Sequence, residues 1–266
     1  MPISLTSFTS GTLCFGHRWK ITNQSVLEEI VANVLLGKVE HAKKILNGLN
    51  IPASQRNINN AIDDAISKLT AVSDTEHYHR DGLIFQIFSW IAAHKNATSN
   101  TVIADPHLIP AQKGFDGLQI DISSDNNSVE TVRVYEDKAT ENPRSTITSQ
   151  VWPEFKAFYG GERESELDYW LTTLLKYRTD LINDLDNAIE TLIWSDTRKF
   201  RIAITVDHSH DNENEIKKMF KGYDVKVPGD RTLRQSEYIC FDNLRNWMDS
   251  FSANVIVILE SRKTDV

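Results

Sequence analysis

The stretch Gly114-Phe115-Asp116-Gly117, together with Val134-Tyr135-Glu136-Asp137-Lys138, decides the fold expected for this chain. Apolar and polar residues alternate from the first stretch to position 122, and again from position 129 into the second stretch. Alternation with a period of two predicts β-strands. The polar cluster Ser-Ser-Asp-Asn-Asn-Ser between the two runs predicts a turn. The sequence therefore predicts a β-hairpin that brings Asp116 beside Glu136 and Lys138.

The charged residues of this hairpin suggest a chemistry. Residues two apart in a strand share a face, so Glu136 and Lys138 are expected on the face that also carries Val132 and Val134. Two carboxylates can hold a hard divalent cation through oxygen. A lysine beside that cation can orient or activate water. Asp116, Glu136 and Lys138 are therefore candidate catalytic residues for metal-assisted hydrolysis of a phosphodiester.

A second interpretation of the same residues involves no catalysis. A turn acid and a surface ion pair on an edge strand would produce the same pattern, because charged residues often decorate sheet edges. Asp137 belongs to the opposite face of its strand, and we expect it to be a structural hydrogen-bond partner rather than a metal ligand.

The order of these features resembles the PD-(D/E)XK nuclease superfamily over roughly residues 76 to 207. The shared order is a helix, an acidic residue, a hairpin that ends in Glu-x-Lys, and a second helix. The chain has Phe115 where the name-giving pattern has proline. The resemblance implies an α/β fold of restriction-endonuclease type, with a central mixed sheet flanked by helices. It also implies a metal-dependent endonuclease acting on nucleic acid, with DNA as the expected substrate. Asp116 and Glu136 would hold Mg²⁺ or Mn²⁺, and Lys138 would position or help deprotonate the attacking water.

The resemblance points to further residues around the site. Gln86 occupies the position on the preceding helix where the superfamily often carries a metal-reaching glutamate, and Glu76 and Asp81 are competing sources of a helix acid. Gln150 and Arg144 are candidates for contacts with the substrate phosphates. Arg144 is expected at a helix N-terminus, which favours anions. A solvated helix face explains Arg144 and Gln150 equally well.

Composition limits the class of protein. The chain has 266 residues, of which 40% are hydrophobic and 25% charged, as in ordinary globular proteins. We find no apolar run of bilayer length, no membrane partner is expected, and the start does not resemble a signal peptide. Two cysteines, Cys14 and Cys240, exclude a disulfide framework and favour a cytoplasmic protein. Walker, Gly-x-Gly-x-x-Gly and Gly-x-Ser-x-Gly patterns are missing from the sequence, which disfavours ATPases and α/β-hydrolases.

The net charge is −8, with 29 basic and 37 acidic residues. Residues 162–196 hold nine acids and three bases, a balance of −6. Residues 198–234 hold nine bases and six acids, a balance of +3. Proteins that bind nucleic acid unaided are usually basic. The charge thus argues against strong autonomous DNA binding and leaves room for a partner that brings the substrate.

The apolar periodicity predicts two regions, an N-terminal helical lobe over residues 1–73 and a nuclease core over 74–266 with a helical insertion near 162–196. Residues 1–20 are expected to form a strand or an irregular arm. In the N-terminal region, two helices are expected over 24–49 and a third from Pro52 or Ser54. In the core, one helix is expected to be capped by Asp74 or Thr75, and another to begin at Pro143 and kink at Pro153. A long helix over 165–194 and two shorter ones over 212–220 and 242–251 complete the expected set. The remaining expected strands lie at 201–207, 223–227, 238–241 and 255–259.

Two His-x-His pairs invite a zinc interpretation, namely His77 with His79, and His208 with His210 in the stretch Asp207-His208-Ser209-His210-Asp211. A His-x-His pair can chelate a cation, but a zinc site needs a third and a fourth ligand. A polar loop after a strand explains the pair more simply, so no zinc is expected. A zinc hydrolase remains an alternative that elemental analysis would reveal.

The resemblance also bears on partners. Stand-alone subunits with this layout are similar to effector nucleases of bacterial anti-phage defence, among them Hachiman-type nuclease subunits that work with a helicase. This similarity implies a helicase or ATPase partner that delivers DNA. The rival interpretation is a non-catalytic interaction or scaffold protein with a nuclease-like fold, which the acidic segment near 162–196 also fits.

Overall fold

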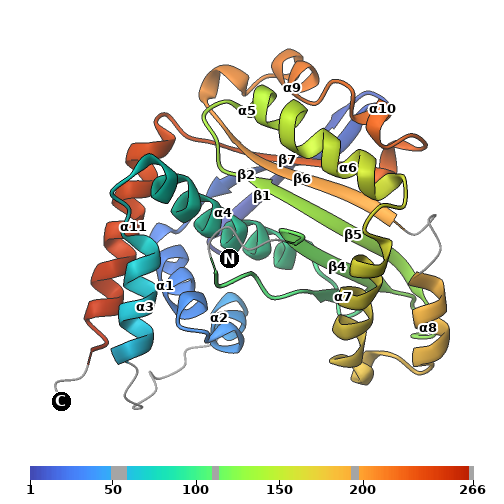
Figure 1. The fold of residues 1–266 in the computed structure, drawn as a ribbon, viewed down its shortest axis with the longest axis horizontal. Coiled ribbons are helices and arrows are strands. Elements are labelled where there is room, and N and C mark those ends of the chain that lie inside the picture. Colours follow the sequence, from blue (N-terminus) through green and yellow to red (C-terminus); the bar gives the residue numbers. More distant parts are fainter. Residues whose placement is uncertain (49–58, 110–113, 193–197, 264–266) are drawn as a thin grey trace.

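The computed structural model describes residues 1–48, 59–109, 114–192 and 198–263. Its described part is an α/β structure built on one seven-stranded mixed sheet flanked by helices (Figure 1). In the order in which they pair, the strands are β1 (Ile3–Ser10), β2 (Cys14–Ile21), β7 (Arg234–Cys240), β6 (Arg198–Val206), β5 (Val129–Lys138), β4 (Gly117–Ile122) and β3 (Thr101–Ile103).

The middle of the sheet is parallel and its margins are antiparallel. Strands β2, β7, β6 and β5 run parallel to one another, whereas β1 pairs with β2, β4 with β5 and β3 with β4 in antiparallel fashion. The burial of β6 explains its near-continuous apolar sequence, because a central parallel strand is covered on both faces. These pairings confirm the predicted mixed sheet with parallel members and the predicted β4–β5 hairpin.

One face of the sheet is covered by helices from both ends of the chain. They are α1 (Gln24–Leu35), α2 (Val39–Leu46), α3 (Asn59–Leu69), α4 (Asp74–Asn96) and α11 (Leu244–Glu260). Their apolar side chains form one core with sheet residues such as Trp19 and Ala203. Helix α4 lies deepest in this layer, and nearly all of its residues from Leu83 to Ala93 are buried. Its first turn is closed by a capping box between Ser73 and Glu76, so Ser73, not the predicted Asp74 or Thr75, is the cap.

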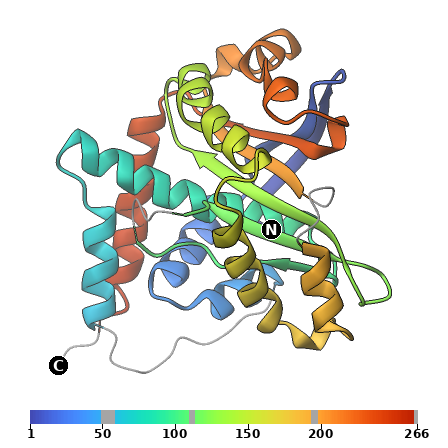
Figure 2. The same cartoon turned by 45° about the vertical axis from the view of Figure 1, so that its right-hand side comes forward.

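The opposite face carries the helices between β5 and β7. They are α5 (Pro143–Thr146), the π-helical turn η1 (Ile147–Val151), α6 (Trp152–Tyr159), α7 (Glu164–Lys176), the 3₁₀ turn η2 (Thr179–Leu181), α8 (Leu185–Leu192), the 3₁₀ turn η4 (His208–His210), α9 (Glu213–Met219), α10 (Tyr223–Lys226) and the 3₁₀ turn η5 (Arg231–Leu233). Aromatic residues dominate the centre of this core, where Phe155 packs against Phe200 and stacks on Tyr223. Helices α7 and α8 lie together at the end of the sheet that bears the β4–β5 turn (Figures 1 and 2).

Two predicted strands are helices. Residues 223–226 form α10, with Val227 as its C-cap, and residues 255–259 continue α11. The apolar run Val255-Ile-Val-Ile-Leu259 resembles a strand, but Val255 and Leu259 extend the buried face that Phe251 begins, at a spacing of four. The neighbouring Val257 is 64% exposed, as the outer side of a helix requires.

The long helix predicted over 165–194 is two helices. Helix α7 ends at Lys176, and Asp184 starts α8 by accepting a hydrogen bond from the backbone N–H of Asn187. The end of the predicted helix, including Trp194, lies outside the described residues, as does the predicted start of the third helix at Pro52 or Ser54.

The remaining predicted helices match α1, α2, α9 and the α5–α6 stretch, which is interrupted just before Pro153. The two-region division at residue 73 stays a prediction. The structure places β1 and β2 in the common sheet, and α1 packs against α4 and α11. Within the described ranges, each helix is too short or too polar to cross a bilayer.

Candidate active site

The hairpin brings the three predicted catalytic residues together at its open end. Gly117 pairs with Tyr135, so Asp116, one residue earlier, comes level with Glu136, one residue later. A Cβ atom on Gly117 would lie 2.6 Å from Cδ2 of Tyr135. Glycine therefore allows the two strands to approach where the site is built.

Lys138 joins the two carboxylates. Its Nζ donates a hydrogen bond of 2.9 Å to Oδ2 of Asp116 and lies 2.8 Å from Oε2 of Glu136. Two carboxylates that touch one ammonium group can approach one metal cation in the same way. The side chains are largely buried, with exposed fractions of 15% for Asp116, 6% for Glu136 and 21% for Lys138.

Two further donors hold Asp116. The backbone N–H of Asp137 donates to Oδ2 over 2.8 Å, and Nε2 of Gln86 donates to Oδ1 over 2.7 Å. Gln86 projects from α4, so this bond links the helix to the hairpin. From the sequence, Gln86 could ligate a metal weakly, hold a water or simply pack as a polar residue against the core. In the structure it orients the carboxylate of Asp116.

The buried carboxylates alter the titration of the site. Burial raises the pKa of Glu136 to about 8, the charge of Lys138 opposes this change, and the charge of Asp116 adds to it. Burial alone would lower the pKa of Lys138, but the carboxylates of Glu136 and Asp116 outweigh burial and leave that pKa above its ordinary value. Lys138 therefore stays protonated, and Glu136 also holds a proton below about pH 8. A cation bound beside Glu136 would favour the ionised carboxylate and displace that proton.

Asp137 lies on the other face of β5, as predicted. Its side chain is 5% exposed, and its Oδ1 has no hydrogen-bond partner among the described residues. Burial raises the pKa of Asp137 to about 7, and the nearby charge of Arg201 opposes that rise. Its backbone N–H acts as the expected structural donor, but its carboxylate remains only partly satisfied.

Two cavities meet at the site. One has a volume of about 790 Å³ and reaches toward α6 and α7. The other has a volume of about 610 Å³ and reaches toward the start of α4 and the segment after β5. Their shared lining residues are Gln86, Asp116, Lys138, Ser149 and Gln150. The hollow surface is thus continuous past Lys138, as an extended polymer substrate would need.

The two predicted phosphate contacts have different outcomes. Gln150 is exposed in η1 and lines both cavities. Arg144 is not among the described residues that line them, because its Nη1 donates to the backbone carbonyls of Met219 and Lys221 over 2.8 Å each. The structure thus does not bring Arg144 to these cavities, and its side chain instead binds backbone carbonyls at the end of α9.

The two candidate helix acids are also engaged elsewhere. Glu76 belongs to the capping box at the start of α4. Asp81 is 1% exposed and is bound by the guanidinium groups of Arg80 and Arg245. Neither carboxylate lines the cavities at the site within the described part of the chain.

Three residues that line the larger cavity were not predicted from the sequence, namely Arg163, Glu154 and Glu166. Arg163 donates to Glu154 over 3.1 Å and to both carboxylate oxygens of Glu166 over 2.8 Å. Its guanidinium also lies over the rings of Phe115 and Phe158, at 5.1 and 4.9 Å. A left-handed backbone at Arg163 (φ 59°) after the diglycine turn gives this orientation, and no local sequence pattern foretells it.

The charge of the larger cavity favours a cation. Its described lining carries four carboxylates, those of Asp116, Glu136, Glu154 and Glu166, against the two basic groups of Lys138 and Arg163. Phosphate groups would be repelled here unless positive charge were added.

The predicted His-x-His pair does not converge on one point. Nδ1 of His210 lies 2.9 Å from Oδ1 of Asp207, whereas Nε2 of His208 lies 3.3 Å from Oδ1 of Asp242.

A comparison with protein-family models and a search of curated proteins each gave no match to the chain.

Proposed function

We propose that this protein is a metal-dependent nuclease that hydrolyses phosphodiester bonds, with DNA as its substrate. The observation that carries the proposal is the contact of one lysine, Lys138, with the carboxylates of Asp116 and Glu136 at the junction of two cavities. A buried pair of carboxylates that shares a lysine is poorly explained as an edge-strand ion pair, because such pairs lie in solvent.

The residues present fit a divalent cation. Asp116 and Glu136 would hold Mg²⁺ or Mn²⁺, which prefer carboxylate oxygen. When bound, the cation would supply Lewis-acid stabilisation of the charge that develops on the phosphate. The excess of carboxylates in the larger cavity supports this fit.

Lys138 would act on the attacking water. With its pKa above the ordinary value, its ammonium group is a hydrogen-bond donor that can orient the water. Neutralisation of the neighbouring carboxylates would remove the interactions that raise its pKa. Lys138 could then accept a proton, so the same side chain can position the water and assist its deprotonation.

The order of elements supports an assignment to the PD-(D/E)XK superfamily and its restriction-endonuclease type of fold. Helix α4 precedes Asp116, the β4–β5 hairpin separates Asp116 from Glu136 and Lys138, and α5 follows. Gln86 supports the assignment as well, since it reaches Asp116 from the helix position where the superfamily often has a glutamate.

The decisive experiment is plasmid cleavage by the purified chain with added metal. We expect nicking with Mg²⁺ and Mn²⁺, none with Ca²⁺ because it binds in looser geometry, and none with EDTA. Glu136→Ala and Lys138→Ala should each lower the rate at least about a hundredfold, as loss of an acid–base group does.

Matched controls come from the same region. Glu130 is an exposed glutamate on β5 and Lys156 is an exposed lysine on α6. Glu130→Ala and Lys156→Ala should cleave at the wild-type rate. Cleavage that survives EDTA, or that both site substitutions leave intact, would refute the proposal.

We further propose that the nuclease works in a complex of bacterial anti-phage defence, of the Hachiman type, with a helicase or ATPase partner. A net charge of −8 gives little attraction to DNA phosphates, which supply most non-specific affinity. A partner that translocates DNA would provide the substrate.

A non-catalytic interaction protein is the second candidate function. The observation that favours it is a group of exposed aromatic residues on α7 and just beyond it, with exposed fractions of 66% for Tyr169, 42% for Trp170 and 80% for Tyr177. Exposed aromatic surface commonly marks a docking site. This function predicts partner binding without plasmid cleavage, so the metal experiment separates the two candidates.

A further inference from the structure

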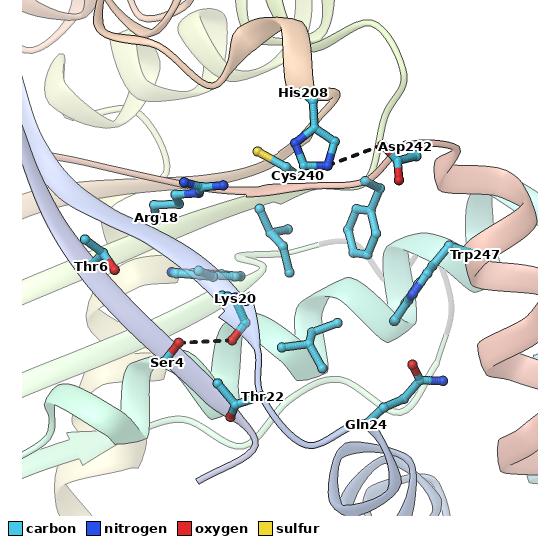
Figure 3. Close-up of a pocket in the computed structure, with 14 residues that line it drawn as sticks. Ser4, Thr6, Arg18, Lys20, Thr22, Gln24, His208, Cys240, Asp242 and Trp247 are labelled. Carbon is cyan, nitrogen blue, oxygen red and sulfur yellow. Dashed lines mark hydrogen bonds and ion pairs between the residues drawn. The ribbon is translucent and has the colours of Figure 1, made fainter.

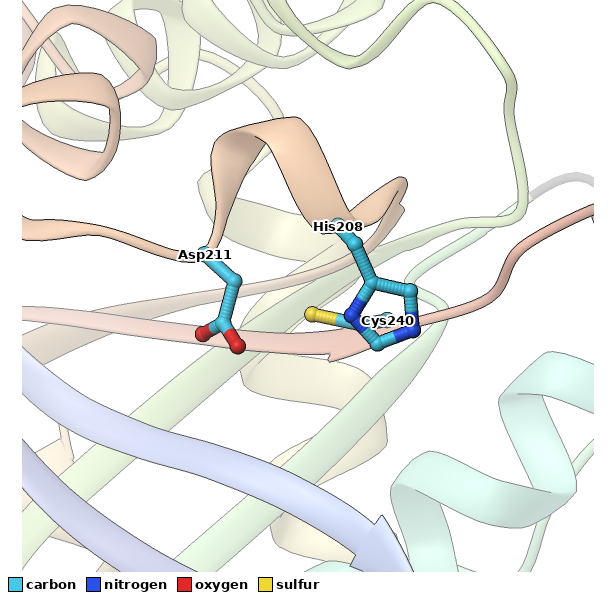
Figure 4. A group of neighbouring side chains, drawn as sticks. All are labelled: His208, Asp211 and Cys240. Atoms are coloured by element: carbon cyan, nitrogen blue, oxygen red, sulfur yellow. The ribbon is translucent and has the colours of Figure 1, made fainter.

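A second cluster of metal-binding side chains lies at the carboxyl ends of β6 and β7. His208 and Asp211 come from the segment after β6, and Cys240 is the last residue of β7. One ligand atom from each of the three residues lies within 4.8 Å of the others. Figure 4 shows the imidazole ring, the carboxylate and the sulfur gathered around one space.

We propose that His208, Asp211 and Cys240 form a Zn²⁺ site. Thiolate and imidazole ligands together select zinc over magnesium or calcium, which prefer oxygen alone. Ligand atoms around a tetrahedral zinc are separated by about 3.3–3.8 Å, given bond lengths of roughly 2.0–2.3 Å. The three separations here are at most 4.8 Å, and His208, whose side chain is 56% exposed, can rotate to bring its nitrogen closer to the other two ligands.

The surroundings of the cluster resemble the outer shell of a zinc site. Oδ1 of Asp242 lies 3.3 Å from Nε2 of His208, and a carboxylate on one ring nitrogen leaves the other nitrogen available for a metal. Nη2 of Arg18 lies 2.5 Å from Oδ2 of Asp211, and the hydroxyl of Tyr238 donates to its Oδ1 over 3.2 Å. These contacts hold the Asp211 carboxylate beside the sulfur.

An open path reaches the cluster. A cleft of about 740 Å³ is lined by His208 and Cys240, and by Arg18, Lys20 and Asp242 around them (Figure 3). Three protein ligands leave one coordination position for water, and the cleft supplies that water. The stretch Asp207–Asp211 predicts no zinc by itself, because it offers no cysteine. The third ligand, Cys240, is distant in sequence and adjacent only through the pairing of β6 with β7.

A bound zinc would fasten the segment after β6 to the end of β7. That end of β6 also contacts the segment that lines the smaller cavity, because Thr205 Oγ1 accepts from the backbone N–H of Thr140 and donates to its carbonyl, at 2.7 Å each. The zinc site is nevertheless independent of the nuclease proposal, since its residues take no part in the Asp116–Lys138 cluster.

The test uses Co²⁺ as a spectroscopic substitute for zinc, in excess Mg²⁺ that occupies carboxylate sites. One equivalent of Co²⁺ should give the near-ultraviolet thiolate-to-cobalt absorption, and added Zn²⁺ should abolish it. Cys240→Ser should remove the absorption, and Cys14→Ser, at the other cysteine, should retain it. His208→Ala should weaken Co²⁺ binding at least about tenfold, whereas His210→Ala should leave it unchanged.

Thermal unfolding provides a readout that does not depend on the thiolate absorption. Zn²⁺ should raise the midpoint of the wild-type protein through preferential binding to the folded state, and should not raise that of His208→Ala. His208 is exposed, so this variant keeps the test valid even if Cys240→Ser does not fold. An absorption that persists in Cys240→Ser, a wild-type chain without absorption, or equal losses in His208→Ala and His210→Ala would overturn the proposal.

Discussion

At the scale of single residues, the site depends on how Asp116 is held. Its two oxygens accept from three donors, the side chains of Gln86 and Lys138 and the backbone N–H of Asp137. A carboxylate fixed in this way is pre-oriented for a cation, and loss of an orienting partner commonly lowers metal affinity 10- to 100-fold.

Gln86→Leu should therefore raise the Mg²⁺ concentration needed for half-maximal cleavage by roughly 10- to 100-fold. Saturating Mg²⁺ should restore most of the rate, because Gln86 only positions a ligand. Gln150→Ala is the matched comparison. It should weaken the apparent affinity for DNA and leave the Mg²⁺ dependence unchanged. An unaltered Mg²⁺ requirement in Gln86→Leu would count against this role.

The raised pKa of Glu136 makes a prediction about stability. A carboxyl group with a raised pKa binds its proton more tightly in the folded protein than in the unfolded chain. Its contribution to stability is complete below its ordinary value of 4.5 and is lost as the pH rises toward about 8. Glu136→Gln mimics the protonated group and cannot titrate. In metal-free buffer, the stability of Glu136→Gln relative to wild type should therefore increase as the pH rises from roughly 5 to roughly 8.

Denaturant titrations at several pH values measure this change. Glu130→Gln, at an exposed position on the same strand, should show no such trend. A relative stability of Glu136→Gln that is constant across the interval, or that falls as the pH rises, would contradict the raised pKa.

At the scale of elements, close strand approach limits what can be substituted. Gly16 of β2 pairs with Ser236 of β7, and a Cβ atom on Gly16 would lie 1.6 Å from the Ser236 carbonyl oxygen. Gly16→Ala should separate β2 from β7 and reduce the free energy of unfolding by about 3 kcal/mol or more, at the upper end of overpacking costs.

The control is a glycine with free space around it. A Cβ atom on Gly82, within α4, would meet nothing within 4 Å. Gly82→Ala should stabilise the protein by about 0.5–1 kcal/mol through helix propensity. Equal effects of the two substitutions in denaturant titrations would show that the strand contact is not tight.

The elements also show how far the sequence could be interpreted. The β4–β5 hairpin and the buried strand β6 were predictable because alternation and apolar runs directly reflect burial. The end of α11 was not predictable, since its β-branched run suits a strand locally and only packing against α1 and α3 makes it a helix.

The same limit applies to the site. Its three central residues lie on one hairpin and were predicted together, whereas Arg163 and Cys240 reach their places through turns and strand pairings that leave no local pattern.

At the scale of the whole molecule, the exposed aromatic residues of α7 and the weak expected affinity for DNA suggest that a partner subunit docks on α7 and delivers the DNA. A pull-down from the native host should recover a larger ATP-dependent DNA-translocating partner. The isolated chain should bind duplex DNA weakly at physiological salt, because it offers few neutralising charges.

Trp170→Ala combined with Tyr177→Ala should abolish recovery of that partner and leave plasmid cleavage by the isolated chain intact. The matched control is Val257→Ala, at an exposed apolar position on α11 in the opposite helical layer. Tight, salt-resistant DNA binding by the pure chain, with no recovered partner, would instead favour an autonomous restriction-type enzyme.

The π-helical turn η1 has a consequence for the length of the chain. Ile147 and Val151 are buried at its ends, and the three residues between them, Thr148, Ser149 and Gln150, are all exposed. A π turn holds one residue more than an α-helical turn, and a single residue rotates an α-helix by about 100°. Loss of Thr148 would bring the segment back into α-helical phase and rotate Gln150 away from Lys138. The direction of this side chain is therefore set by the number of residues in the turn, and deletion of Thr148 would turn Gln150 out of the cavities while every residue that lines them is kept.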